Sequence, residues 1–291
     1  MSEVSILSGL TRADIRREPF AHIVIENCLP EALYRELSRT FPADETILRM
    51  DSSLQGRPAK PNSRHDVGAH CILKNPECFS ASWRAFVGHH VSNAFFREFV
   101  GLMGQEIAAA YPDLERRLNR PLSELRTGIL HSPEASNCDV ALDCHIGINT
   151  PSRRGGSVRR VHTDAPDELF AALLYFRSEN DQAAGGDLEI FQWKPNAARR
   201  FVGSEVDESD VQRSYTVAAK ANTAVVFVNT SAALHAVSAR HPSIVSRRLV
   251  NIMGRVPRSI PEGLFVKRQK AGLKSLGRRA LQRVRMAAGQ F

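Results

Sequence analysis

The sequence contains no apolar run that approaches the roughly 18 residues of a membrane span. Its N-terminal stretch carries Glu3 and Asp14 and lacks the apolar segment of a secretion signal. The cysteines are odd in number and lack CxxC spacing, which argues against a zinc ribbon, a redox motif or a disulfide framework. We therefore expect a soluble, cytoplasmic protein with reduced thiols.

Most of the chain also has no net charge. Residues 257–291 hold nine Lys or Arg and one acid, so the formal net charge of +8 lies in this segment and residues 1–256 are balanced. Nucleic-acid binding is usually accompanied by a basic groove or face, so nucleic acid is not an expected partner. Apolar residues recur at 3- and 4-residue steps from Leu273 to Ala287. This amphipathic tail could contact an anionic membrane or an acidic partner protein, or it could pack on the rest of the chain.

The N-terminal part of the chain has mixed character. FAHIVIEN, residues 20–27, predicts a strand, and an amphipathic helix is expected to begin near Pro30. Residues 51–75 are polar and rich in Gly and Pro, which predicts a loop or lid. Apolar spacing near 3.6 then predicts helices from 82 to 111.

After about residue 130 the pattern changes to short apolar runs separated by Gly, Asn and Asp. Such runs without intervening helices indicate antiparallel strands. We expect a mainly β protein with flanking helices (α+β). Residues 1–128 would supply an N-terminal strand and supporting helices, 129–256 the β core, and 257–291 the basic amphipathic tail.

A histidine and an aspartate stand two residues apart in VHTDAPDELFAALLYF, immediately before a run typical of a buried strand. In an extended chain His162 and Asp164 would point to the same side. His235 follows another buried-strand pattern, NTAVVFVNTSAAL. Two histidines and one carboxylate can bind Fe(II) on one face of an octahedron and leave positions for substrates. The alternative is a turn in which the aspartate caps backbone amides.

The order of these motifs resembles that of the iron(II)- and 2-oxoglutarate-dependent oxygenases, in particular the prolyl-4-hydroxylase-like branch. HTD, LLYF, GGDLEIF, a histidine after an apolar strand and an arginine opening the next strand follow one another between Asp139 and Arg255. The resemblance implies a double-stranded β-helix (jelly-roll) barrel core with N-terminal helical support. It also implies that His162, Asp164 and His235 are the catalytic iron ligands.

The same resemblance implies contacts to the cosubstrate. Arg247 matches the residue that binds the distal carboxylate of 2-oxoglutarate, and its neighbour Arg248 is the rival, because adjacent strand residues face opposite sides. Tyr175 matches a tyrosine that reaches the same carboxylate, and Leu188 an apolar wall residue. Many prolyl hydroxylases carry a tyrosine on the strand before HxD. Here Asn149 is the nearest polar candidate.

The implied activity is hydroxylation of an unactivated C–H bond, with conversion of 2-oxoglutarate and O₂ to succinate and CO₂. Fe(II), 2-oxoglutarate and O₂ would be required, with ascorbate as a further candidate cofactor. A small molecule, a glycan or a peptide could be the substrate. Two alternatives stay open at this point: a peptidyl-prolyl hydroxylase, and a jelly-roll binding module without catalysis.

Overall fold

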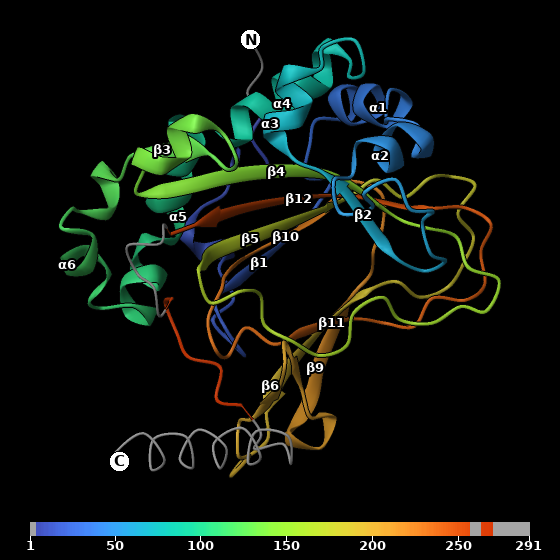
Figure 1. The fold of residues 1–291 in the computed structure, drawn as a ribbon. Coiled ribbons are helices and arrows are strands. Elements are labelled where there is room, and N and C mark those ends of the chain that lie inside the picture. The colour runs from blue at the N-terminus through green and yellow to red at the C-terminus, as the bar shows by residue number, and fades with distance from the viewer. Residues whose placement is uncertain (1–3, 257–262, 270–291) are drawn as a thin grey trace, which may run out of the picture.

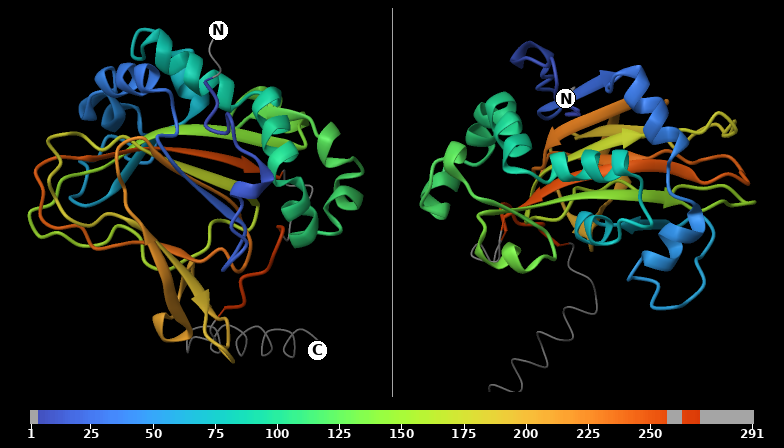
Figure 2. Two further views of the ribbon diagram at one scale, coloured as in Figure 1. Left: turned by 180° about the vertical axis from the view of Figure 1, so that it is seen from behind. Right: turned by 90° about the horizontal axis from the view of Figure 1, so that it is seen from above.

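The computed structural model describes residues 4–256 and 263–269. Two sheets of unequal size face each other, and helices cover the outer face of the larger sheet (Figure 1). The two sheets and the helices are also visible from behind, and the view from above shows the helices beside and over the larger sheet (Figure 2). None of the described helices is long and apolar enough to cross a bilayer. The predicted amphipathic stretch from Leu273 to Ala287 lies outside the described residues.

The larger sheet has seven strands in the order β1-β10-β5-β12-β4-β2, with β3 beside β4. Only the β3–β4 pair is parallel among these ladders. The strands are β1 (His22–Glu26), β2 (Arg64–Val67), β3 (Thr127–Ile129), β4 (Val140–Asn149), β5 (Glu168–Tyr175), β10 (Thr223–Val228) and β12 (Arg247–Arg255).

The smaller sheet has the order β11-β6-β9 and is accompanied by a two-stranded ribbon, β7-β8. These strands are β6 (Leu188–Trp193), β7 (Phe201–Val202), β8 (Glu205–Val206), β9 (Val211–Val217) and β11 (His235–Val237). From β10 to β12 the chain passes from the larger sheet to the smaller one and back. The sheet-rich architecture with flanking helices is therefore as predicted.

The implied closed barrel is not formed among the described residues, since no ladder joins the two sheets. The segment from β4 to β5 instead pairs through isolated bridges, Ser152 with Ser243, Gly156 with Arg240, and His162 with both His235 and Glu205. Continuous strands would be needed there to close the sheet on itself.

Helices are confined mainly to the N-terminal half of the chain. They are α1 (Glu31–Arg39), α2 (Asp44–Met50), α3 (Ala69–Lys74), α4 (Ala81–His90), α5 (Asn93–Ala110) and α6 (Leu114–Leu118), with 3-10 turns at Arg12–Asp14, Leu122–Glu124, Pro133–Asn137 and Glu208–Asp210. A break separates α4 from α5, where the Ser92 hydroxyl accepts from the Phe95 amide and caps α5. The predicted loop at 51–75 is wrong in part, because it contains β2 and α3.

The central strands are buried on both faces, which explains their nearly continuous apolar sequences. In β5, Phe170, Ala172 and Leu174 pack toward the helices. The alternate residues Ala171 and Tyr175 belong to the cluster that packs against the smaller sheet. Because successive side chains of a strand point to opposite faces, β5 contributes to two hydrophobic cores.

Phe170 joins the helix layer to the sheet. Its ring stacks on Phe99 of α5 with centroids 4.0 Å apart, and neither side chain is accessible to solvent. We expect Phe170→Ala to lower the free energy of unfolding by about 3–5 kcal/mol, because it removes a large buried ring and leaves a cavity. Urea denaturation would measure the loss. Val202→Ala, at a side chain that is 58% exposed, should change stability by about 0.5 kcal/mol or less. Equal effects of the two substitutions would contradict this packing.

Candidate functional site

Backbone pairing brings the two predicted histidine ligands together. The amide of His162 donates to the carbonyl of His235, and the amide of His235 donates back, each at 3.0 Å. The imidazole centroids lie 4.3 Å apart. Asp164, two residues after His162, points to the same place: one ligand atom from each of the three residues lies within 4.8 Å of the others. The structure therefore assembles the three side chains that the HxD and His pattern singled out.

The hydrogen bonds of the two imidazoles determine which ring nitrogens face Asp164. Nδ1 of His162 lies 2.8 Å from the Arg160 carbonyl, and Nδ1 of His235 lies 3.0 Å from the Ala233 carbonyl. A carbonyl can only accept, so each Nδ1 carries the proton and each neutral ring directs the lone pair of Nε2 inward. Both Nε2 atoms lie 3.6 Å from Oδ1 of Asp164, too far for a hydrogen bond.

Without a metal, burial opposes the charged form of His235, but Asp164 outweighs this effect and raises the pKa of His235, so a metal would take the place of a proton on that ring. Burial and the charge of His235 lower the pKa of His162 to about 4, so its ring is neutral near pH 7. Burial opposes the ionised form of Asp164, but His235 and His162 outweigh it and hold the pKa of Asp164 well below its usual value. Two lone pairs and a carboxylate that converge in a buried space fit a divalent metal, and this donor set matches that of non-haem iron sites.

A buried arginine that has no carboxylate partner among the described residues lies in the same cavity. Arg247 is 7% exposed; its Nη1 donates to Oδ1 of Asn149 at 3.1 Å, and its guanidinium lies 5.0 Å above the ring of Tyr175. Among the described residues, Nε of Arg247, Nδ2 of Asn149 and the Tyr175 hydroxyl form no hydrogen bond. Burial lowers the pKa of Arg247, although it stays a cation. Arg247 and Asn149 line the cavity, whereas Tyr175 lines a small hollow that Arg247 also borders. Unused donors around a buried positive charge fit an anionic ligand.

Arg248 faces the opposite side of β12. Its guanidinium lies 5.0 Å above the ring of Phe41, in the layer between the sheet and α1. Of the two rival arginines, the structure thus places Arg247 against the candidate cavity and Arg248 away from it. Leu188, the predicted wall residue, lines the cavity and is 2% exposed.

Gly185 and Gly186 adopt positive φ angles of 81° and 80° before β6. A Cβ on Gly185 would lie 2.0 Å from the Ala239 carbonyl oxygen, and one on Gly186 would lie 3.2 Å from Cδ of Arg247. The pair therefore allows the turn to pass close to the next segment and leaves room for the arginine.

The His162–Asp164–His235 cluster and Arg247 share one cavity of about 410 Å³ between the two sheets. Its wall also contains polar residues that the sequence did not single out: Arg64 and Asp66 on β2, His145 on β4, Glu168 on β5, and Asn251 and Arg255 on β12. The alternation of RRLVNIMGR places Asn251 and Arg255 on the Arg247 face and could have identified them. No apolar period marks β2, which lies in the stretch predicted as a loop.

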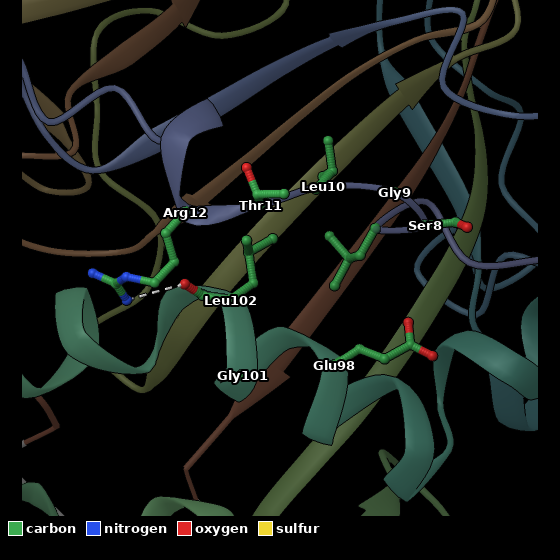
Figure 3. A pocket seen from close by; sticks show the side chains of 9 residues that line it. Ser8, Gly9, Leu10, Thr11, Arg12, Glu98, Gly101 and Leu102 are labelled. Atoms are coloured by element: carbon green, nitrogen blue, oxygen red, sulfur yellow. Dashed lines mark hydrogen bonds between the residues drawn. The ribbon is translucent and has the colours of Figure 1, made fainter.

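A second hollow, of about 380 Å³, lies between the N-terminal segment and α5 (Figure 3). It shares no residue with the cavity between the sheets. Arg12 donates to the carbonyl of Leu102 at its edge, and Glu98 contributes the only carboxylate among its lining residues. It contains no set of side chains comparable with the His162–Asp164–His235 cluster.

No protein-family model matches the sequence, and no curated protein is significantly similar to it. Similar solved structures include a prolyl 4-hydroxylase from Phytophthora capsici, with 16% identity, a TM-score of 0.43, and coverage of 91% of this chain and 68% of that one. The 2-oxoglutarate complex of the dioxygenase for auxin oxidation 1 from Arabidopsis thaliana has 13% identity, a TM-score of 0.41 and coverages of 81% and 83%.

The alpha-ketoglutarate-dependent carbocyclase SnoK of nogalamycin biosynthesis has 13% identity, a TM-score of 0.45 and coverages of 90% and 96%. Prolyl 4-hydroxylases and other 2-oxoglutarate-dependent enzymes are thus among the solved structures similar to this chain.

The first prediction for the site concerns metal binding. Anaerobic calorimetry with Fe(II) should give one site per chain, and Asp164→Ala should weaken binding at least about tenfold, because a direct ligand matters no less than the outer-shell groups that cost 10–100-fold. Asp167→Ala removes a carboxylate from the same loop whose side chain is 45% exposed, and it should leave the affinity unchanged. Equal affinity of the Asp164 variant and the wild type would exclude this ligand set.

The second prediction concerns His145, whose Nε2 lies 2.8 Å from Oδ2 of the buried Asp143. Burial opposes the charged imidazole, but Asp143 outweighs it and raises the pKa of His145. Burial likewise opposes ionisation of Asp143, whose pKa is nevertheless lowered, with the hydrogen bond from His145 the largest favourable cause.

A raised histidine pKa stabilises the fold fully below 6.5, its unperturbed value, and this stability is lost as pH rises through the folded-state pKa. The lowered carboxyl pKa contributes above 3.8 and is lost as pH falls. The stability difference between wild type and His145→Gln should therefore be largest between these values and shrink at alkaline pH. Urea titrations across the pH range would measure it, with the exposed His241→Gln as control. A difference that grows with pH would refute the ion pair.

Proposed function

We propose that this chain is an Fe(II)- and 2-oxoglutarate-dependent dioxygenase that hydroxylates an unactivated C–H bond. The overall reaction would convert the substrate R–H, 2-oxoglutarate and O₂ into R–OH, succinate and CO₂. The proposal rests on one observation: a convergent His–Asp–His set and a buried arginine, with which no carboxylate of the described residues pairs, face the same cavity.

The metal ligands and the buried arginine support the proposal only in combination. A metal bound by three protein ligands keeps positions for a chelating cosubstrate and for O₂. A dicarboxylate that chelates the metal at one end has a second carboxylate to place, and Arg247 offers a planar guanidinium for it. Neither a lone structural metal nor a lone arginine would account for both features in one cavity of about 410 Å³.

When bound, the iron would supply the oxidising chemistry that no protein side chain provides. The chain itself binds and orients. His162, Asp164 and His235 would hold the metal on one face, while the Nδ1–H bonds to backbone carbonyls keep both imidazoles in the ligating tautomer. Donors from Arg247 and Tyr175 would anchor the distal carboxylate. Leu188 and Phe227, each 2% exposed in the cavity wall, would exclude water.

The finer fold assignment is also a proposal. In the larger sheet β4, β12, β5 and β10 are neighbours in that order, and β11, β6 and β9 are neighbours in the smaller sheet. This order supports an open double-stranded β-helix, with the candidate metal ligands between its two sheets. The division into segments 1–128, 129–256 and 257–291 stays a prediction.

The proposal predicts a visible charge-transfer band when Fe(II) and then 2-oxoglutarate are added without oxygen. Arg247→Met should raise the dissociation constant of 2-oxoglutarate by about 10- to 100-fold, because a charge-assisted bidentate contact is lost. The matched control is Arg248→Met, one residue along on the opposite face, which should bind 2-oxoglutarate like the wild type.

Two results would contradict this assignment. A folded wild type that binds neither iron nor 2-oxoglutarate would favour a binding module without catalysis. A band that depends on Arg248 and not on Arg247 would exclude the proposed cosubstrate orientation.

A further inference from the structure

Three arginines besides Arg247 line the cavity: Arg255, whose Nη2 donates to Glu168, the exposed Arg159, and Arg64, whose terminal edge is unused. Nε of Arg64 lies 2.9 Å from both carboxylate oxygens of Asp66. Among the described residues, Nη1 and Nη2 of Arg64 form no hydrogen bond, and the side chain is 33% exposed in the cavity wall. A guanidinium with two parallel free N–H groups matches a carboxylate.

The sheet register holds this pair beside the candidate cosubstrate site. Arg64 lies opposite Asn149 on β4, and Asn149 lies opposite Arg247 on β12. Asp66 lies opposite Gly147, where a Cβ would stand only 2.1 Å from Oδ1 of Asp66. The absence of a side chain at Gly147 therefore lets the Asp66 carboxylate lie against the sheet on the face that lines the cavity.

Arg64 and Arg247 cannot both be assigned to 2-oxoglutarate. One carboxylate of this dicarboxylate would be used in chelation, so only the distal carboxylate requires an arginine, and Arg247 is the more buried of the two. Nη1 and Nη2 of Arg64 therefore stay available for another anion, next to the carboxylate of Asp66. Each oxygen of Asp66 has lone-pair capacity beyond the hydrogen bond from Arg64.

We propose that Arg64 and Asp66 bind the α-carboxylate and α-ammonium groups of a free amino acid, whose side chain extends toward the His162–Asp164–His235 cluster. This inference rests on the proposed function and names its substrate class. Adjacent groups of opposite charge match a ligand that carries both charges on one carbon. A residue inside a peptide chain has neither of these charges. A neutral sugar would form no ion pair with Arg64 or Asp66.

The remaining wall fits a small side chain with a polar end. Leu173, Val237 and Phe227 supply apolar surface, and Asn251 has an Oδ1 atom without a hydrogen-bond partner among the described residues. Glu168 and Arg255 form an ion pair of 2.8 Å further along the cavity. The cavity of about 410 Å³ would also hold 2-oxoglutarate, and a free amino acid is small enough to share it.

The test begins with the anaerobic complex of Fe(II) and 2-oxoglutarate, to which each of the twenty standard L-amino acids is added singly. At least one should perturb the charge-transfer band and, in air, stimulate succinate formation. Its N-acetyl and α-amide derivatives, each lacking one charge, should bind at least tenfold more weakly.

Variants then locate the contact. Arg64→Met and Asp66→Asn should each raise the dissociation constant of that amino acid about 10- to 100-fold, while the dissociation constant of 2-oxoglutarate stays within about threefold. Arg35→Met is the matched control, since Arg35 forms an exposed ion pair with Glu31 on α1 at 3.0 Å and lies outside the cavity. Circular dichroism would verify that each variant is folded.

The outcomes separate this inference from the proposed function. A band that forms but responds to none of the twenty amino acids overturns the inference and leaves the dioxygenase standing. Equal binding of the N-acetyl derivative, or a response to neutral sugars alone, also overturns it. Absence of the band overturns the proposed function, and the inference with it.

Discussion

The reciprocal backbone hydrogen bonds between His162 and His235 are the constraint on which the candidate site depends. They join two segments that are far apart in the sequence and bring both imidazoles to one point between the sheets. Asp164 needs only the two-residue spacing of an extended chain to reach the same point. If this pairing were lost, the three ligand atoms would have no common position, however well the larger sheet were formed.

The two faces of the larger sheet have different physical roles. Its outer face packs on the helices through residues such as Phe170 and Leu174, and this burial stabilises the fold. Its inner face carries Arg247, whose Nε has no hydrogen-bond partner among the described residues. Buried charge without a partner is costly, and under the proposed function 2-oxoglutarate would supply the missing partner. The packing on the outer face stabilises the fold enough to tolerate an unpaired charge on the inner face.

Sequence patterns predicted those parts of the site that combine a specific residue type with a strand period. His162 and Asp164 stand out because their spacing and the following apolar run act together, and alternation along β12 separates Arg247 from Arg248. Arg64 and Asp66 gave no such signal, since β2 has four residues and no apolar alternation. That the described strands form no closed barrel was equally unpredictable, because closure depends on how the connecting segments pair with one another.

The segment 263–269 holds the loop that carries Asp164, although composition assigned it to a basic tail. The amide of Leu264 donates to the Pro166 carbonyl at 2.7 Å, and Nζ of Lys267 donates to the Thr163 carbonyl at 2.8 Å. These contacts hold the backbone on both sides of Asp164 while leaving its carboxylate free to face the histidines. Lys267 is thus a partly buried cation that donates to the backbone of the loop carrying Asp164. Net charge alone could not reveal this role. A count of lysines and arginines does not distinguish a side chain that binds another molecule from one that forms a contact within its own chain.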